Sequence, residues 1–133
     1  MGEYVFSLTM KVRDYECDIQ GVVNNANYLH YLEHTRHEFL ESLGVSFGEL
    51  HEKKVDAVVS HINISYKASL FGGNTFISAL RLTKKGVKII FFQQIIRQED
   101  QKLCCEAEVE IVILENGKLT RGDYFDPLIK DYI

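Results

Sequence analysis

Residues 24–44, NNANYLHYLEHTRHEFLESLG, contain the one long helical pattern of this chain. Their apolar side chains recur at spacings of three, seven and four residues, which places them along one side of a helix from about 26 to 43. These apolar residues are Leu29, Leu32, Phe39 and Leu43. Asn24 or Asn25 suits the N-cap, and Gly44 stands where a glycine commonly ends a helix. The segment therefore predicts one long helix with a defined beginning and end.

The rest of the chain has the patterns of β-strands. Residues 4–12 alternate between apolar and polar before the helix, and five later segments are alternating or almost wholly apolar. The later segments lie near 58–67, 75–83, 87–97, 103–113 and 119–124. Residues 87–97 are apolar almost throughout, which is typical of a central strand that is covered on both faces.

Short turns connect the predicted strands that follow the helix. Asn116 and Gly117 form a hairpin signal, and no crossover helix lies between these strands, so they are expected to be antiparallel. Before them, Ser46 with Glu49 predicts a short second helix. One long helix against an antiparallel sheet predicts an α+β fold with five to six strands. No repeat or linker divides the sequence, so residues 1–133 are expected to form one domain.

The composition excludes several classes of protein. The formal net charge of −4 argues against a general nucleic-acid binder, which needs a basic face. No apolar run approaches the roughly 20 residues that span a bilayer, and residues 1–10 lack the features of a signal peptide. Three cysteines, an odd number, do not suit a disulfide framework, so we predict reduced thiols in the cytoplasm.

The segment from Cys17 to Tyr28, which leads into the long helix, contains the strongest candidates for catalytic residues. It places Asp18 seven residues before the helix start. A helix N-terminus presents unpaired N–H groups and partial positive charge, which can stabilise an oxyanion. A carboxylate beside it can attack a carbonyl or activate water. Acyl transfer is therefore chemically available, although loops of this kind also carry Asp and Asn as caps and turn formers.

Seven residues of this segment and the helix form a sequence motif that resembles that of a known family. They are Asp18, Gly21, Val22, Val23, Tyr28, Glu33 and Arg36. The glycine follows the aspartate by three residues and the tyrosine by ten, and the last two residues form Glu-x-x-Arg. This pattern resembles the 4-hydroxybenzoyl-CoA thioesterase family of hotdog-fold proteins, which includes bacterial short-chain acyl-CoA thioesterases. The order of strands and helix also matches, so the resemblance covers nearly the whole chain and implies the hotdog fold.

The resemblance implies hydrolysis of a small acyl-CoA or aryl-CoA to the free acid and CoA. Asp18 would be the nucleophile or the general base, and the backbone N–H of Asn25 would polarise the thioester carbonyl. Gly21, with no side chain, would let the chain approach the substrate closely. Asn24 and Tyr28 complete the substrate-binding residues expected in this segment. No metal or redox cofactor is implied.

Two further groups of residues are candidates for substrate binding. Strict alternation places Val58 and Ile62 on one face of their strand, and His61 and Asn63 on the other, where they can line the acyl pocket or serve strand pairing. In related thioesterases, basic residues near the turn after residues 75–83 meet the CoA phosphates. Charged hairpins are also common at sheet edges, so both interpretations stay open. The residues concerned are Lys84, Lys85 and Lys88.

Cys17 and the histidines of the helix are weaker candidates. Cys17 adjoins Asp18, but local spacing places no histidine beside it, so we expect an inert thiol. His30, His34 and His37 lack the tight spacing and the further ligands of a zinc-binding helix, so no metal site is expected.

The resemblance also implies a homodimer or homotetramer with active sites between subunits. One helix cannot cover both faces of a sheet whose strand at 87–97 is apolar along its length, which favours association. Two alternative functions remain: a hotdog protein that binds an acyl-CoA without hydrolysing it, and a hotdog dehydratase. The dehydratase needs a histidine base, and residues 18–28 contain none.

Overall fold

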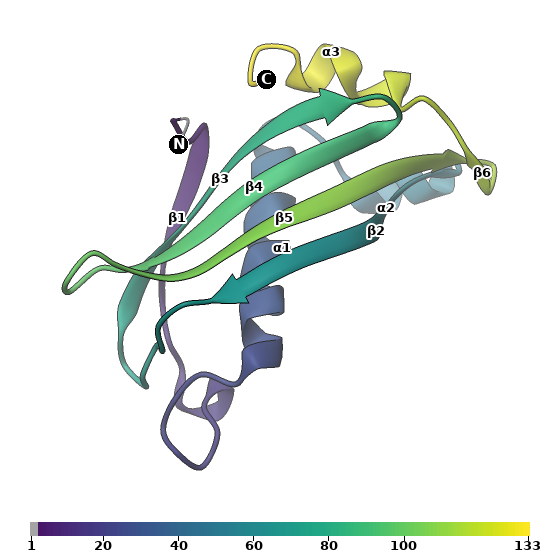
Figure 1. Cartoon of the computed structure of the whole chain (residues 1–133). Helices are drawn as coiled ribbons and strands as arrows, with labels where there is room; N and C mark the ends of the chain where they lie inside the picture. Colours follow the sequence, from purple (N-terminus) through teal and green to yellow (C-terminus); the bar gives the residue numbers. More distant parts are fainter. Residues whose placement is uncertain (1–2) are drawn as a thin grey trace.

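The computed structural model describes residues 3–133, which form one antiparallel sheet with a long helix against it (Figure 1). The sheet has six strands in the order β1-β3-β4-β5-β2, and β6 pairs with β5. The strands are β1 (Phe6–Lys11), β2 (Val55–Tyr66), β3 (Thr75–Lys85), β4 (Lys88–Arg97), β5 (Lys102–Glu115) and β6 (Lys118–Leu119). This arrangement confirms the α+β class and the predicted number of strands.

The long helix α1 (Asn25–Ser42) begins and ends close to its predicted limits. The Asn24 side chain accepts a hydrogen bond from the Ala26 N–H at 2.9 Å, which confirms one of the two predicted N-caps. The structure corrects the predicted buried face of the helix at one position, because Leu29 is 37% exposed. The buried stripe repeats every three or four residues from position 28, so position 29 lies at its solvent edge. The stripe consists of Tyr28, Tyr31, Leu32, Thr35, Arg36, Phe39 and Leu40.

A β-bulge in β2 corrects the predicted alternation of that strand. β2 pairs regularly with β5 up to Val59 and again from His61, but the register shifts between these two residues. A bulge inserts one extra residue and so changes which positions share a face. Val59, rather than Val58, therefore faces the same way as Ile62, while His61 and Asn63 remain together on the opposite face.

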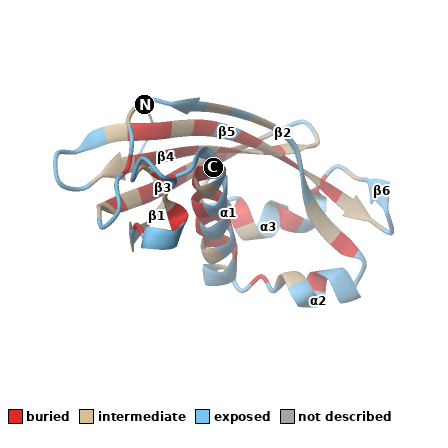
Figure 2. Ribbon diagram, turned by 90° about the horizontal axis from the view of Figure 1, so that it is seen from below, coloured by how far each residue is buried: buried red, intermediate tan, exposed pale blue. Residues whose placement is uncertain are grey.

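β4 is the central strand of the sheet, as its apolar sequence predicts. On the side of α1, Ile89, Phe91 and Ile95 are buried. On the opposite side, Ile90 and Phe92 remain partly exposed. Figure 2 shows that α1 and two shorter helices, α2 (Phe47–Glu52) and α3 (Asp126–Ile129), all lie on one side of the sheet. The sequence predicts that β4 is covered on both faces. Within the described residues, only the face toward the helices is covered.

The last hairpin confirms one predicted turn and corrects one strand. Asn116 and Gly117 have φ angles of 54° and 76°, the left-handed conformation of the predicted hairpin. The strand that follows, β6, contains only two residues instead of the predicted 119–124. Beyond it, the chain turns back under the sheet as helix.

Four short helices complete the fold: the 3-10 helices η1 (Asp14–Glu16) and η2 (Asp123–Phe125), and the α-helices α2 (Phe47–Glu52) and α3 (Asp126–Ile129). The side chain of Ser46 accepts a hydrogen bond from the Glu49 N–H at 3.4 Å, which confirms the predicted start of α2. Phe125 and Ile129 are each 1% exposed, so burial of these two side chains explains why the C-terminal segment is helical. Among the residues described, no helix is long and apolar enough to cross a membrane.

Candidate active site

The loop before α1 folds into a tight turn with Asp18 at its base. Cys17 and Val23 form an antiparallel bridge, and the Asp18 N–H donates to the Val22 carbonyl at 2.9 Å. The Gly21 N–H donates to the Asp18 carbonyl at 3.0 Å. Gly21 has a φ of 81°, which favours glycine, and a Cβ at this position would meet no atom within 4 Å. Gly21 therefore serves the turn and also leaves the space beside it open.

The Asp18 carboxylate is exposed, and Gln20 holds it in place. The Gln20 backbone N–H donates to Oδ1 at 3.0 Å. In the orientation that satisfies both side chains, the Gln20 amide nitrogen also donates to the two carboxylate oxygens at 2.8 Å and 3.1 Å. These hydrogen bonds restrict the direction of the carboxylate but leave it accessible to a ligand.

The first turn of α1 has a backbone donor that no other described residue uses. The Asn24 side chain is occupied as the helix cap, and the Asn24 carbonyl accepts from the Asn27 N–H at 2.9 Å. The N–H of Asn25 donates to no acceptor within residues 3–133. It is therefore available to a ligand oxygen, whereas the side chain of Asn24 serves the helix.

Glu16 anchors this loop on α1, a role that its place in the sequence does not predict. It is 7% exposed, and its Oε1 accepts from the Tyr31 hydroxyl at 2.8 Å and from the Arg13 N–H at 2.8 Å. Its Oε2 forms an ion pair with Arg13 Nη1 at 2.7 Å. Its carbonyl accepts from the Asn24 N–H at 3.0 Å and from Asn27 Nδ2 at 2.7 Å. An acidic residue in a polar loop carries no signal of such burial, so only the structure reveals this role.

Tyr28 lies inside the protein rather than at its surface. It is 4% exposed, and its hydroxyl accepts from the Leu70 N–H at 3.0 Å. Burial raises the pKa of Tyr28, so its hydroxyl stays protonated. Tyr66, at the end of β2, packs edge-on against this ring and donates to the Asn25 carbonyl at 3.2 Å. Tyr28 and Tyr66 thus fix the helix start against the sheet.

A cavity of about 250 Å³ lies between the second half of α1 and the sheet, and we call it the helix-side cavity. Its mouth is lined by the exposed residues Glu33, His37, Val58 and Val59. Arg36 belongs to its wall and is buried. The deepest residues are apolar and buried: Leu40, Ile89, Phe91, Ile113, Phe125 and Ile129. No local sequence pattern predicts a pocket from these residues, because they come from five separate elements.

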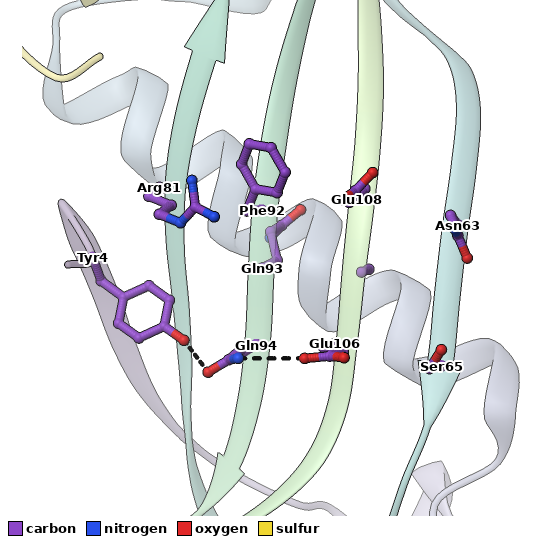
Figure 3. A pocket seen from close by; sticks show the side chains of 10 residues that line it. Tyr4, Asn63, Ser65, Arg81, Phe92, Gln93, Gln94, Glu106 and Glu108 are labelled. Carbon is purple, nitrogen blue, oxygen red and sulfur yellow. Dashed lines mark hydrogen bonds between the residues drawn. The ribbon is translucent and has the colours of Figure 1, made fainter. Parts of the chain in front are cut away.

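A second cavity, of about 340 Å³, lies on the opposite face of the sheet, and we call it the outer cavity (Figure 3). Asn63 lines it and His61 shares the face of Asn63, and neither residue is among those that line the helix-side cavity. Figure 3 shows the hydroxyl of Tyr4 donating to Gln94, whose amide donates to Glu106 at 3.5 Å. The outer cavity is lined by Tyr4, Asn63, Ser65, Arg81, Phe92, Gln93, Gln94, Glu106, Ala107 and Glu108.

The three candidate lysines lie far from Asp18 within one chain. They flank the turn between β3 and β4, whereas the Asp18 turn pairs through Val22 with Phe71, just before the other end of β3. At about 3.3 Å per residue, the length of β3 separates the two places by about 30 Å. The structure therefore does not bring the lysines and Asp18 into one site in a single chain.

Two of these lysines are engaged in ion pairs. Lys84 Nζ lies 2.7 Å from the Asp126 carboxylate, and Lys88 pairs with Glu110. Lys85 is exposed and forms no ion pair with any residue in the described range. Of the three, Lys85 is the one whose charge is available to a ligand.

The thiols and histidines form no obvious catalytic or metal centre. Desolvation and the neighbouring carboxylates of Asp14 and Asp18 raise the pKa of the Cys17 thiol, the opposite of what a nucleophilic cysteine needs. Cys104 and Cys105 are free and buried. In the part of the chain that the structure describes, no group of His, Cys, Asp and Glu side chains is arranged to hold a metal ion.

Comparison with known proteins identifies relatives over most of the chain. Residues 12–129 match the model of the thioesterase-like superfamily. The chain is 36% identical over 110 residues to a chloroplastic acyl-acyl carrier protein thioesterase of Arabidopsis thaliana, covering 82% of this chain and 58% of that protein. It is 28% identical over 116 residues to an acyl-CoA thioesterase of Haemophilus influenzae, covering 86% and 84%. The chain thus spans little more than half the length of the chloroplastic relative.

Solved structures share the fold. A probable thioesterase from Escherichia coli superposes with a TM-score of 0.82 at 25% identity, covering 96% of this chain and 98% of that one. A 1,4-dihydroxy-2-naphthoyl-CoA thioesterase from Synechocystis superposes with a TM-score of 0.80 at 19% identity, covering 86% and 87%. At that identity, the second likeness concerns the fold alone.

Proposed function

Because this chain belongs to the thioesterase-like superfamily and has the hotdog fold, we propose that it hydrolyses a small acyl-CoA or aryl-CoA to the free acid and CoA. One observation carries the proposal: an exposed carboxylate, Asp18, stands in the loop that leads to an unused N–H at the start of α1. An exposed acid and a free helix-start donor are the two groups that thioester hydrolysis needs.

The chemistry follows from these two groups. The Asn25 N–H donates to the thioester carbonyl oxygen and stabilises the negative charge that develops on it. Asp18 removes a proton from water, the water oxygen bonds to the carbonyl carbon, and the C–S bond breaks. The departing CoA thiolate then takes the proton. Direct attack by the Asp18 carboxylate, with hydrolysis of the resulting anhydride, uses the same two groups.

The edge strand β2 supports assembly into a homodimer. β2 is an edge strand of the sheet and is 12 residues long. Two of its apolar side chains, Val58 and Val59, are 37% and 44% exposed. Long apolar edges of this kind pair readily with another chain. We therefore infer that β2 pairs antiparallel with β2 of a second copy. The uncovered face of β4 would let two such dimers associate as a tetramer.

Pairing of the two edges would place the active site between subunits. The Tyr66 end of β2 contacts the start of α1 through Asn25, whereas Val58 and Val59, toward the other end, line the mouth of the helix-side cavity. Antiparallel pairing about the middle of β2 sets the Tyr66 end of one copy beside the Val55 end of the other. The Asp18 turn of one copy then faces the helix-side cavity of the other, which accommodates the acyl group.

Thiol release from a panel of thioesters tests the proposal. The panel contains straight-chain acyl-CoAs of increasing length, aryl-CoAs, and the same acyl groups on acyl carrier protein. We expect hydrolysis of at least one CoA thioester by the wild type, and its loss in Asp18→Asn. Tight CoA binding with no thiol release from any substrate would instead identify a binding protein, and an enoyl thioester product would identify a dehydratase.

A further inference from the structure

Arg36 is a buried cation that forms no ion pair with any residue the structure describes. It is 6% exposed, yet no carboxylate within residues 3–133 forms an ion pair with it. By contrast, Arg13 pairs with Glu16, and Arg97 pairs with Asp100. Buried charges in proteins are normally paired, because an isolated one loses its hydration without compensation. Arg36 therefore needs an explanation that the chain alone does not supply.

The single hydrogen bond of Arg36 fixes its orientation. Arg36 Nη1 donates to Gln93 Oε1 at 2.9 Å, and Gln93 Nε2 donates to the Leu32 carbonyl at 3.0 Å. The Gln93 amide is thus held with its oxygen toward Arg36. A guanidinium has five N–H donors, so most of those of Arg36 remain unused. Burial lowers the pKa of Arg36, while the nearby carboxylate of Glu33 opposes this effect.

Arg36 lines the helix-side cavity, and its Nε and Nη2 form no hydrogen bond within residues 3–133. Among the described residues, Arg81 Nε is the only fully enclosed side-chain nitrogen or oxygen without a partner. The remaining nitrogens of Arg36 are therefore not fully enclosed, and Arg36 is one of the residues that line the helix-side cavity. The deep residues of that cavity are apolar, so Arg36 is its one buried charge.

We propose that Arg36 determines substrate specificity, by donating to an oxygen carried on the acyl group that occupies the helix-side cavity. This inference rests on the proposed thioesterase function. A plain alkyl chain would displace water from the guanidinium and leave it buried and unpaired. A hydroxyl, keto or carboxylate oxygen would restore its hydrogen bonds. Sites built around such a donor discriminate strongly against analogues that lack the oxygen.

Matched six-carbon substrates test this inference. We would measure kcat/KM for hexanoyl-CoA, 3-hydroxyhexanoyl-CoA, 6-hydroxyhexanoyl-CoA and adipoyl-CoA, which differ in the presence, position and charge of one oxygen-bearing group. The wild type should favour at least one oxygenated substrate over hexanoyl-CoA by about tenfold or more. A preference for adipoyl-CoA would indicate a carboxylate, and a preference for a hydroxyacyl-CoA would indicate a neutral oxygen.

Variants of Arg36 attribute the preference to this residue. Arg36→Met, similar in length but uncharged, should lose the preference, so that its kcat/KM for the oxygenated substrate and for hexanoyl-CoA become similar. Arg36→Lys should keep part of the preference. Arg81→Met is the matched control, because the guanidinium of Arg81 lies over the Phe92 ring in the outer cavity, 4.0 Å from its centre. This control should leave the preference unchanged.

Gln93→Glu is a second variant that retains Arg36 but gives it a carboxylate partner, and it should reduce the preference even if Arg36→Met does not fold. Equal turnover of all four substrates by the wild type would overturn the inference, as would an undiminished preference in Arg36→Met. Dissociation of Arg36→Met into monomers, with no substrate preference in the wild type, would assign Arg36 to the dimer interface instead. Binding of the same CoA esters to Asp18→Asn separates failure of this inference from failure of the proposed hydrolysis.

Discussion

Glu16 and Asp18 are carboxylates two residues apart in one loop, yet their surroundings are opposite. Glu16 is buried, and its side chain is bound by Tyr31 and by Arg13. Asp18 is exposed, and within residues 3–133 its carboxylate accepts hydrogen bonds only from Gln20. The first carboxylate holds the loop on α1, and the second is left accessible on the loop that the first one holds. Stability and chemistry are thus divided between neighbouring residues, and mutations should separate them.

Asp18→Asn should have the largest effect on turnover. The change keeps the size and hydrogen bonding of the side chain but removes its basicity, so kcat should fall at least about a hundredfold. The melting temperature should stay within error of the wild type, because the carboxylate is exposed. Stopped assays of CoA release, with calorimetry on the same samples, check both expectations. If pure Asp18→Asn released CoA at the wild-type rate, Asp18 would have no part in the mechanism.

Asn25→Pro should come next, because it deletes the proposed oxyanion donor. Losing one such donor typically lowers kcat by about a hundredfold to a thousandfold. The fold should tolerate the change, since position 25 is the first of α1, where proline is favoured, and Asn24 already has the extended φ and ψ of −62° and 140°. Asn25→Ala keeps the N–H and is the matched control. Full activity in a natively folded Asn25→Pro protein would refute the helix-start donor.

Glu16→Gln should lower the stability of the protein more than its turnover. The amide oxygen can still accept from the Arg13 N–H and the Tyr31 hydroxyl, but the amide nitrogen then meets the donor Arg13 Nη1 and the ion pair is lost, so the free energy of unfolding should fall by about 1–3 kcal/mol. Urea denaturation monitored by circular dichroism measures this change. Tyr31→Phe, which removes one of the same hydrogen bonds, should show a smaller loss. If Glu16→Gln kept full stability but lost activity as Asp18→Asn does, the division between the two carboxylates would be wrong.

Lys85→Gln should give the smallest effect. If Lys85 contacts the CoA phosphates, KM for an acyl-CoA should rise a few-fold, while hydrolysis of a short pantetheine thioester should not change. Lys84→Gln breaks the ion pair with Asp126 and should instead lower stability. Its effect on hydrolysis should be the same for the acyl-CoA and for the pantetheine thioester. Equal effects of Lys85→Gln on both substrates would contradict a role in phosphate binding.

The sequence alone determined the features that depend on neighbouring residues. The approximate limits of α1, an asparagine cap at position 24 or 25, the start of α2 and the hairpin at Asn116 and Gly117 all follow from local hydrogen bonding and backbone preference. The antiparallel sheet followed from short connections between the strands. The spacing that singles out Asp18 is also local, so the loop could be identified as a candidate site before its geometry was known.

Only the tertiary structure decided which side chains are buried together. Glu16 meets Tyr31 fifteen positions later, and Arg36 meets Gln93 fifty-seven positions later, so no local pattern reports either contact. The bulge of β2 changed which of its residues share a face, and the length of β3 separated the lysines from Asp18. Burial depends on the packing of distant elements, and it is burial that makes Glu16 an anchor and leaves Arg36 as an unpaired charge beside a cavity.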